Sequence, residues 1–235
     1  MVKEIAILMA AGLGSRMRPL TDTIAKPLVR VNGVPLIETV IAALERRCVA
    51  EIYVVTGYKA DQFVAIAGKH SNVRLVHNAE YATKNNINSI AVVADKMRSS
   101  DCFVCESDLF LPKADVLCRE LMGSGYFGKM VAGFSDDWVF ETDADGRITR
   151  VGKGGTDCFN MVGISYFRQS DAAKIASAIV EDVKKDENAN LFWDEVVNRL
   201  VKNDELDLVV HPVSSDEIIE CDTIEDLKKL EAKLK

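Results

Sequence analysis

Residues 4–18 read EIAILMAAGLGSRMR, and residues 24–38 read IAKPLVRVNGVPLIE. The first segment is a short apolar run that ends in glycine, which is the pattern of a buried strand. Gly12 and Gly14 follow it, and glycine lets backbone N–H groups approach phosphate oxygens closely. The segment has neither the G-K-[ST] of a Walker A loop nor the third glycine of a dinucleotide fingerprint. Taken alone, the glycines fit an ordinary turn between a strand and a helix equally well.

Apolar strands alternate with helical patterns through the first half of the chain. Strands are predicted at residues 4–12, 51–58, 73–78 and 102–110, and helices at 35–48, 59–70 and 86–97. Strands joined by helices favour a parallel sheet, because crossovers between parallel strands are long and usually helical. We therefore expect an α/β protein with a three-layer, Rossmann-like fold and a mostly parallel central sheet.

The pattern changes after Asp108. Residues 129–154 predict two or three short antiparallel strands joined by a DADG turn at 143–146, and another strand covers 160–167. Helices are predicted at 170–185, N-capped by Ser170 or Asp171, and at 191–202. Late strands follow at 206–213 and 218–222, before a closing helix capped by Thr223. We expect one domain over residues 1–235, with a small β-rich insertion at about 112–165 that covers an acceptor site.

Composition excludes several functional classes. The formal net charge is -7, whereas binding to duplex nucleic acid normally needs a basic surface. The sequence has neither a signal peptide nor an apolar run of about 18 residues, so we expect a cytoplasmic protein without a membrane partner. Cys102 and Cys105 form a C-x-x-C inside a predicted strand, where alternation places their side chains on opposite faces. Buried free thiols are favoured over a zinc or redox site.

The full stretch from residue 8 to residue 38 carries a more specific signal. LMAAGLGSRMRPLT, AKPL and VPLIE resemble the signature of nucleotidyltransferases that make nucleotide-activated sugars and alcohols, with Met9 as an apolar departure. Later segments, including YATKNNINSI, FVCESDLF, DDWVF, LFWDEVV and IIECDTIEDLKKLE, are similar in order to the branch of bacterial CTP:phosphocholine cytidylyltransferases. The resemblance covers nearly the whole chain and implies attack by an acceptor phosphate on the α-phosphorus of a nucleoside triphosphate.

The resemblance assigns roles at the phosphates. Backbone groups of Ala11, Gly12, Leu13 and Gly14 are expected to hold the nucleotide phosphates. Arg16 matches the family arginine at the β- and γ-phosphates, and Lys26 matches the lysine near the α-phosphate. With Asp108, these two residues form the expected catalytic set. Asp108 and Asp222 match the metal-binding aspartates, which implies Mg²⁺ as cofactor. Glu106 and Glu220 share strand faces with these aspartates, and Leu109 departs from the polar residue common there.

The remaining predicted site residues read the base and the acceptor. Gly57 and Tyr58 follow the second strand, where the base is expected to lie. Asn85, Asn86 and Ser89 stand where relatives place base- or ribose-reading groups, although the Asn run also fits a helix N-cap. A quaternary ammonium is recognised by aromatic faces, and Trp is the best of them. Acceptor-binding residues are accordingly predicted as Trp138, Trp193, Asp194 and Asp137, with Phe192 and Tyr166 as further walls. Core packing of both tryptophans is the alternative.

The resemblance favours CTP and phosphocholine as substrates. The carboxylates flanking each tryptophan also suit a primary amine, so 2-aminoethylphosphonate and phosphoethanolamine stay open as acceptors. A sugar-1-phosphate nucleotidyltransferase is less expected, because the longer sugar-binding region of that branch is missing. A catalytically silent nucleotide sensor is the rival from another class, but it would be expected to lose Arg16, Lys26 or a metal aspartate. A homodimer, or fusion to another enzyme domain, is compatible with the sequence.

Overall fold

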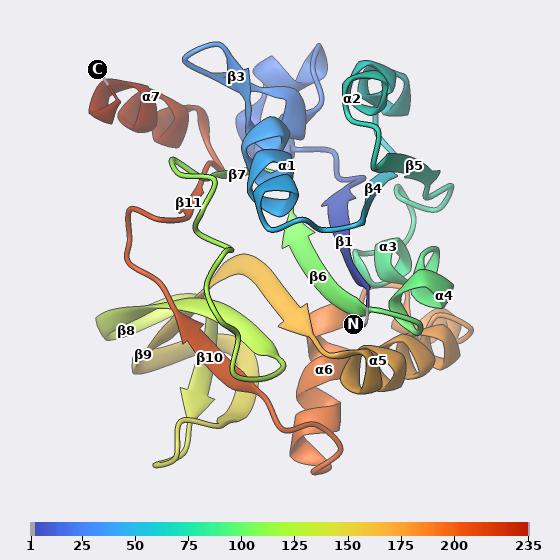
Figure 1. The fold of residues 1–235 in the computed structure, drawn as a ribbon, viewed down its shortest axis with the longest axis vertical. Coiled ribbons are helices and arrows are strands. Elements are labelled where there is room, and N and C mark those ends of the chain that lie inside the picture. Colours follow the sequence, from blue (N-terminus) through green and yellow to red (C-terminus); the bar gives the residue numbers. More distant parts are fainter. Residues whose placement is uncertain (1–2, 235) are drawn as a thin grey trace.

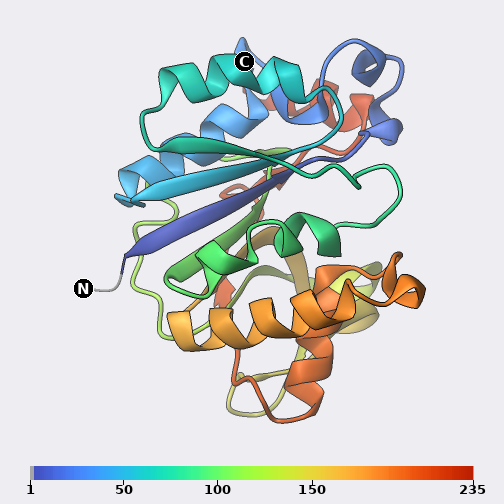
Figure 2. The same cartoon turned by 90° about the vertical axis from the view of Figure 1, so that its right-hand side faces the viewer.

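The computed structural model describes residues 3–234 and places the N-terminal strand inside a seven-stranded sheet (Figures 1 and 2). Its strands lie in the order β10-β8-β9-β6-β1-β4-β5. They comprise β1 (Glu4–Ala10), β4 (Glu51–Thr56), β5 (Val73–His77), β6 (Asp101–Glu106), β8 (Gly125–Thr142), β9 (Ile148–Phe167) and β10 (Val209–Pro212). Within this sheet only β9 runs antiparallel to its neighbours, so the predicted mostly parallel sheet is confirmed.

Helices cover both faces of the sheet (Figure 2). One core layer packs α1 (Leu36–Arg46) and α2 (Val64–Lys69) against one face. The other layer uses α3 (Ile87–Ala91), α4 (Ala94–Met97), α5 (Gln169–Asp182) and α6 (Trp193–Lys202). Alternation along β6 puts Cys102 in the second layer and Cys105 in the first, as predicted, and both are free thiols. The three-layer α/β fold is therefore confirmed.

Short elements lie at the end of the fold that holds the C-terminal helix (Figure 1). The strand β2 (Arg30–Val31) pairs with β3 (Val34–Pro35), and β7 (Leu109–Phe110) pairs with β11 (Ile219–Glu220). The closing helix α7 (Ile224–Lys233) packs through Leu230 on a small third cluster. Short 3-10 turns cover Ser15–Met17, Leu20–Asp22, Lys26–Leu28, Ala60–Phe63 and Asp186–Asn188. Thr223 caps α7 through a reciprocal pair of hydrogen bonds with Asp226, as predicted.

Three predicted elements differ in detail. The helix expected at 86–97 breaks into α3 and α4, because Val93 takes a non-helical backbone conformation between them. The strand expected at 102–110 ends at Glu106, and β7 resumes only at Leu109. The predicted N-cap of α5 was wrong: Arg168 is the cap residue, and Ser170 lies within the first turn. The Asp171 carboxylate instead accepts a hydrogen bond from Ser124 at 2.6 Å.

The predicted β-rich segment is one long hairpin of β8 and β9 that continues the central sheet (Figure 1). Register shifts along β8 interrupt the pairing, including one between Ser135 and Trp138. Such irregularities bend strands and increase their twist. The outer part of the hairpin carries Trp138 to the cleft described below. No helix among residues 3–234 is long and apolar enough to cross a membrane.

Candidate active site

The loop after β1 forms one wall of a cleft at the carboxyl edge of the parallel strands. Gly14 has φ +63, and a Cβ at this position would lie 2.8 Å from Lys26 Cβ, so only glycine fits without displacement. The Thr21 hydroxyl donates a hydrogen bond to the Gly14 carbonyl at 2.9 Å. Met17 is fully buried and anchors the loop in the third core cluster. These contacts fix the loop directly against Lys26.

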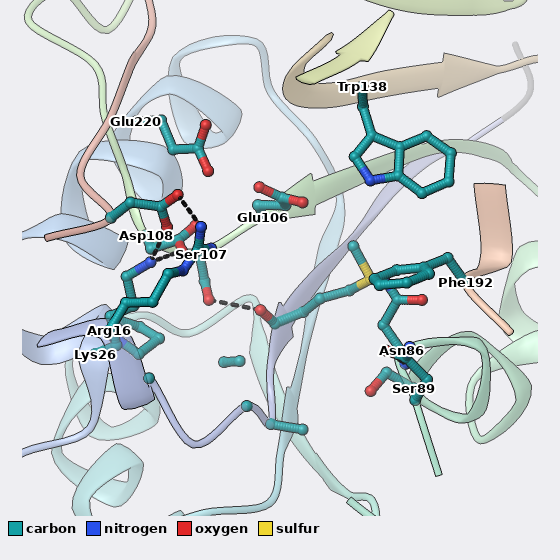
Figure 3. A pocket seen from close by; sticks show the side chains of 18 of the residues that line it. Arg16, Lys26, Asn86, Ser89, Glu106, Ser107, Asp108, Trp138, Phe192 and Glu220 are labelled. Atoms are coloured by element: carbon teal, nitrogen blue, oxygen red, sulfur yellow. Dashed lines mark hydrogen bonds and ion pairs between the residues drawn. The ribbon is translucent and has the colours of Figure 1, made fainter. Parts of the chain in front are cut away.

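Lys26 joins two carboxylates that lie far apart in the chain (Figure 3). Its ammonium donates hydrogen bonds to Asp108 and Asp222, both at 2.5 Å. Arg16 reaches the other Asp222 oxygen at 2.7 Å. Lys26 is only 7% exposed; burial lowers its pKa, but the two carboxylates outweigh burial and leave the pKa raised. Burial alone would raise the pKa of Asp222, but its contacts with Lys26 and Arg16 outweigh burial and leave that pKa lowered. Two cations thus pair with the two aspartates at this end of the cleft.

Asp108, Glu220 and Asp222 form a carboxylate cluster in the described part of the chain. One oxygen from each lies within 4.8 Å of the others. The β7–β11 pairing places Leu109 opposite Glu220, and the Cys221 N–H donates to the Asp108 carbonyl at 3.2 Å. These backbone contacts bring the two predicted metal-binding aspartates together. Oxygen-only donors of this kind suit Mg²⁺, which takes one or two carboxylates together with substrate phosphates.

Aromatic side chains line the opposite end of the cleft (Figure 3). The rings of Trp138 and Phe192 have centroids 5.5 Å apart and meet at 63°. The ammonium of Lys153 lies 6.0 Å from the Trp138 centroid and 5.6 Å from that of Phe192. This distance is within the range of a cation–π contact. The Lys153 ammonium therefore lies beside the aromatic pair formed by Trp138 and Phe192.

Two further carboxyl residues, Glu106 and Asp194, line the cleft. Asp194 is 5% exposed, and its Oδ1 accepts a hydrogen bond from the Tyr126 hydroxyl at 3.0 Å. Burial raises the pKa of Asp194 to about 7, because desolvation outweighs that hydrogen bond. Burial and neighbouring carboxylates also raise the pKa of Glu106. Both residues border a smaller cavity of about 10 Å³, roughly the space of one water molecule.

The Asn run is held against the segment that precedes α6. Asn85 donates from its side chain to the Asn190 carbonyl at 3.0 Å, and its own N–H donates to Ala189 at 2.7 Å. Asn86 Oδ1 accepts the Trp193 N–H at 3.0 Å. These bonds tie the loop before α3 to the start of α6. Asn86 occupies the N-cap position of α3, but its side chain makes no capping hydrogen bond there. The Asn side chains line the cleft and also stabilise its wall.

The cleft has a volume of about 600 Å³ and brings together most of the predicted site residues. They are Ala11, Gly12, Gly14, Arg16, Lys26, Asn85, Asn86, Ser89, Asp108, Asp137, Trp138, Asp194 and Asp222. A volume of this size falls in the usual range for small-molecule sites.

Four predicted site residues do not line the cleft. Leu13 is 43% exposed, and Trp193 is 3% exposed and packs on Tyr126 with ring centroids 5.8 Å apart. The prediction that Trp193 forms a wall of the acceptor site was therefore wrong. Trp193 is the first residue of α6, and its side chain packs in the second core layer. Gly57 lies behind the cleft, where a Cβ would meet Tyr81 at 2.5 Å. Tyr58 supports the glycine loop through its N–H, which donates to Ala11 at 3.1 Å.

Tyr166, predicted as a further wall, is also a core residue. It is 6% exposed, and its hydroxyl donates to Asp101 at 3.1 Å.

Several cleft residues were missed at the sequence level. Tyr81, Lys84 and Lys153 line the cleft, and the predictions assigned them no role. The hairpin places Lys153 opposite Trp138, but a register shift between Glu141 and Thr142 means that counting outward from the DADG turn does not predict this pair. Nothing in the local sequence marks Lys84, whose ammonium pairs with Glu80 at 2.9 Å.

The fold and this cleft define a nucleotidyltransferase. Residues 6–137 match the family model described as a MobA-like NTP transferase domain, and the chain belongs to this family. The expectation that the chain is an enzyme of this class is confirmed.

Full-length relatives are cytidylyltransferases. The chain is 45% identical to a 2-aminoethylphosphonate cytidylyltransferase from Lancefieldella rimae, over 96% of this chain and 91% of that protein. It is 33% identical to a choline-phosphate cytidylyltransferase from Streptococcus pneumoniae, over 98% of each chain. The solved structure of the CTP:phosphocholine cytidylyltransferase from Streptococcus pneumoniae superposes with a TM-score of 0.88, at 32% identity over 100% of both chains.

Proposed function

We propose that this chain transfers a cytidylyl group from CTP to 2-aminoethylphosphonate and releases pyrophosphate. The observation that carries the proposal is the arrangement of one cleft. The charged cluster around Lys26 lies at one end and the aromatic pair of Trp138 and Phe192 at the other, with Glu106 between them; the buried Asp194 also lines the cleft. Relatives that cover nearly the whole chain include enzymes for this acceptor and for phosphocholine.

In the proposed reaction, a phosphonate oxygen of the acceptor forms a bond to the α-phosphorus of CTP. The bond between that phosphorus and the oxygen bridging to the β-phosphate breaks, and pyrophosphate leaves with the electron pair. No strong base is needed, because the phosphonate is already ionised near neutral pH. Both reactants are anions, so the protein must align them and neutralise their repulsion.

The chain supplies that neutralisation from its own residues. Backbone N–H groups of Gly12 and Gly14 are proposed to hold the phosphates, with Arg16 at the leaving end and Lys26 at the α-phosphoryl oxygens. Lys26 suits this position because it is nearly buried and fixed by two carboxylates. Fixed charges in a partly desolvated site stabilise a transition state without reorganising. Asn85, Asn86 and Ser89 are proposed to read the nucleoside, since all three line the cleft.

We further propose that Asp108, Asp222 and Glu220 hold Mg²⁺. Their oxygens lie close enough to share one ion, and the donor set fits a hard cation. Bound there, the ion would neutralise charge on the phosphate oxygens.

The acceptor assignment rests on the chemistry at the base of the cleft. A primary ammonium donates N–H hydrogen bonds, and Glu106 and Asp194 line the cleft with oxygens that can accept them; a bound ammonium would favour the charged forms of both groups. Asp136 and Asp137 add exposed carboxylates at the rim. Phosphocholine is the second candidate, favoured by Trp138 and Phe192. However, only one of the two tryptophans predicted to contact a quaternary ammonium, Trp138, lines the cleft.

Pyrophosphate release tests the proposal. The assay combines each of the four nucleoside triphosphates with 2-aminoethylphosphonate, phosphocholine, phosphoethanolamine or glucose 1-phosphate. We expect the highest kcat/KM for CTP with 2-aminoethylphosphonate. Highest kcat/KM with a sugar phosphate would refute the acceptor class, and no pyrophosphate release from any pair would favour a silent nucleotide-binding role.

A further inference from the structure

Lys153 lies on the cleft side of the β8–β9 hairpin, directly across from Trp138 in the strand register. Its ammonium lies 5.6 Å from the Phe192 ring centroid and 6.0 Å from that of Trp138. Within residues 3–234, no carboxylate lies within ion-pair distance of this ammonium, although Asp136 and Asp137 line the same cleft. The contacts of this cation are therefore with aromatic rings.

A trimethylammonium group would need the same aromatic faces. It carries no N–H donor, so attraction to aromatic faces is its main source of specific recognition. With the Lys153 ammonium at those faces, a trimethylated head group meets a like charge and loses access to the rings. Like charges at this separation repel in a partly desolvated site.

A primary ammonium does not face this conflict. It is smaller and donates up to three hydrogen bonds, so carboxylates rather than rings can hold it. Glu106 and Asp194 line the same cleft as the aromatic pair, and both also border the smaller cavity. An amine bound at these carboxylates leaves Lys153 in place on Trp138 and Phe192.

We propose that Lys153 is a specificity-determining residue that selects against acceptors with a trimethylammonium head group. This inference rests on the proposed function, because it concerns the choice among acceptors at that site. Lys153 acts by occupying the aromatic pair, and it takes no part in the bond changes at phosphorus.

The test compares Lys153→Met with wild type. Methionine keeps an unbranched side chain of similar reach and removes the charge. Lys153→Arg retains the charge, and Lys129→Met removes one from the same hairpin at a residue that does not line the cleft. For each protein, kcat/KM is measured with CTP and either 2-aminoethylphosphonate or phosphocholine. Thermal unfolding checks that each variant is folded, which is expected because Lys153 is exposed.

We expect Lys153→Met to raise the kcat/KM ratio of phosphocholine to 2-aminoethylphosphonate by roughly 2- to 30-fold, the range of one cation–π contact. Lys153→Arg and Lys129→Met should keep the wild-type ratio. An unchanged ratio in Lys153→Met would overturn the proposal. An equal loss with both acceptors would overturn it too, because that result assigns Lys153 to the anionic end that both acceptors carry, a phosphonate in one and a phosphate in the other.

Calorimetry with phosphocholine alone separates this proposal from the proposed function. If wild type turns over neither acceptor, the proposed function fails, while tighter phosphocholine binding by Lys153→Met still supports the role of Lys153. Equal affinities of wild type and Lys153→Met, or no binding by either, would contradict it.

Discussion

The Lys26 ammonium lies 2.5 Å from Asp108 Oδ2, across 82 positions of sequence. The same ammonium bonds Asp222, so one buried cation joins the loop after β1, the end of β6 and the segment after β11. Removing one partner of such a cluster leaves buried charge unpaired. The cluster therefore links the geometry of the charged end of the cleft to the chemistry proposed there.

Lys26→Ala should lower kcat far more than it raises the KM for CTP. Charge builds on the α-phosphoryl oxygens as bonds change, so a fixed ammonium there binds the transition state more tightly than the substrate. Steady-state kinetics with CTP varied at saturating acceptor measures the two effects separately. A rise in KM at constant kcat would mean that Lys26 contributes equally to substrate and transition-state binding.

Asp108→Asn and Asp222→Asn should each lower kcat at least about a hundredfold, a loss of about 2.7 kcal/mol of transition-state stabilisation. Asparagine keeps the shape of each side chain but removes the negative charge that pairs with Lys26 and is proposed to hold Mg²⁺. Turnover is measured over a range of Mg²⁺ concentrations. Near-wild-type rates for both variants would end the metal assignment.

Trp138→Ala and Trp193→Ala should have different effects, although both residues were predicted from sequence to bind the acceptor. Trp138 lines the cleft, and in a Lys153→Met background, where its ring face is free, its loss should raise the phosphocholine KM by about two- to thirtyfold while the KM for CTP stays constant. Trp193 is a core residue, and its loss should cost about 3–5 kcal/mol of unfolding free energy. Denaturant unfolding and acceptor kinetics distinguish the two. If Trp193→Ala kept the wild-type free energy of unfolding and raised only the acceptor KM, Trp193 would have to be assigned to the acceptor site.

Asp194→Asn should stabilise the fold, and more so at pH 8 than at pH 4. The folded-state pKa of Asp194, about 7, lies above the value of 3.8 for an unburied carboxyl, so the folded state holds the proton more tightly. In wild type, the contribution of Asp194 to the free energy of unfolding is therefore largest below about pH 4 and is lost as the pH rises through 7. The shift corresponds to about 4 kcal/mol at most. Unfolding measurements across pH test this, with Asp186→Asn at an exposed position as the control. A pH-independent difference between Asp194→Asn and wild type would contradict the prediction.

Local patterns predicted much of this fold. The apolar runs of β1, β4 and β6 and the helical spacing of α1 and α5 appear as expected. The charged end of the cleft was also predictable, because Gly12, Gly14, Arg16 and Lys26 belong to one sequence motif between residues 8 and 38, and all four line the cleft.

The acceptor end was less predictable, because tertiary packing decides which side chains reach the cleft. Phe192 and Trp193 are neighbours in sequence, yet the start of α6 turns Phe192 into the cleft and Trp193 into the core. Composition near a tryptophan does not distinguish these orientations. The position of Lys153 opposite Trp138 depends on the strand register of a bent hairpin, which short-range sequence patterns do not define.

The ³¹P NMR spectrum of a completed reaction tests the central claim most directly. The sample contains wild-type protein, CTP, 2-aminoethylphosphonate and Mg²⁺. The account predicts loss of the free phosphonate signal, formation of inorganic pyrophosphate, and two mutually coupled signals from one phosphate and one phosphonate joined through oxygen. Persistence of unreacted CTP and phosphonate, under conditions where phosphocholine is consumed, would contradict the assigned acceptor. Persistence of CTP with both acceptors would contradict the assigned reaction.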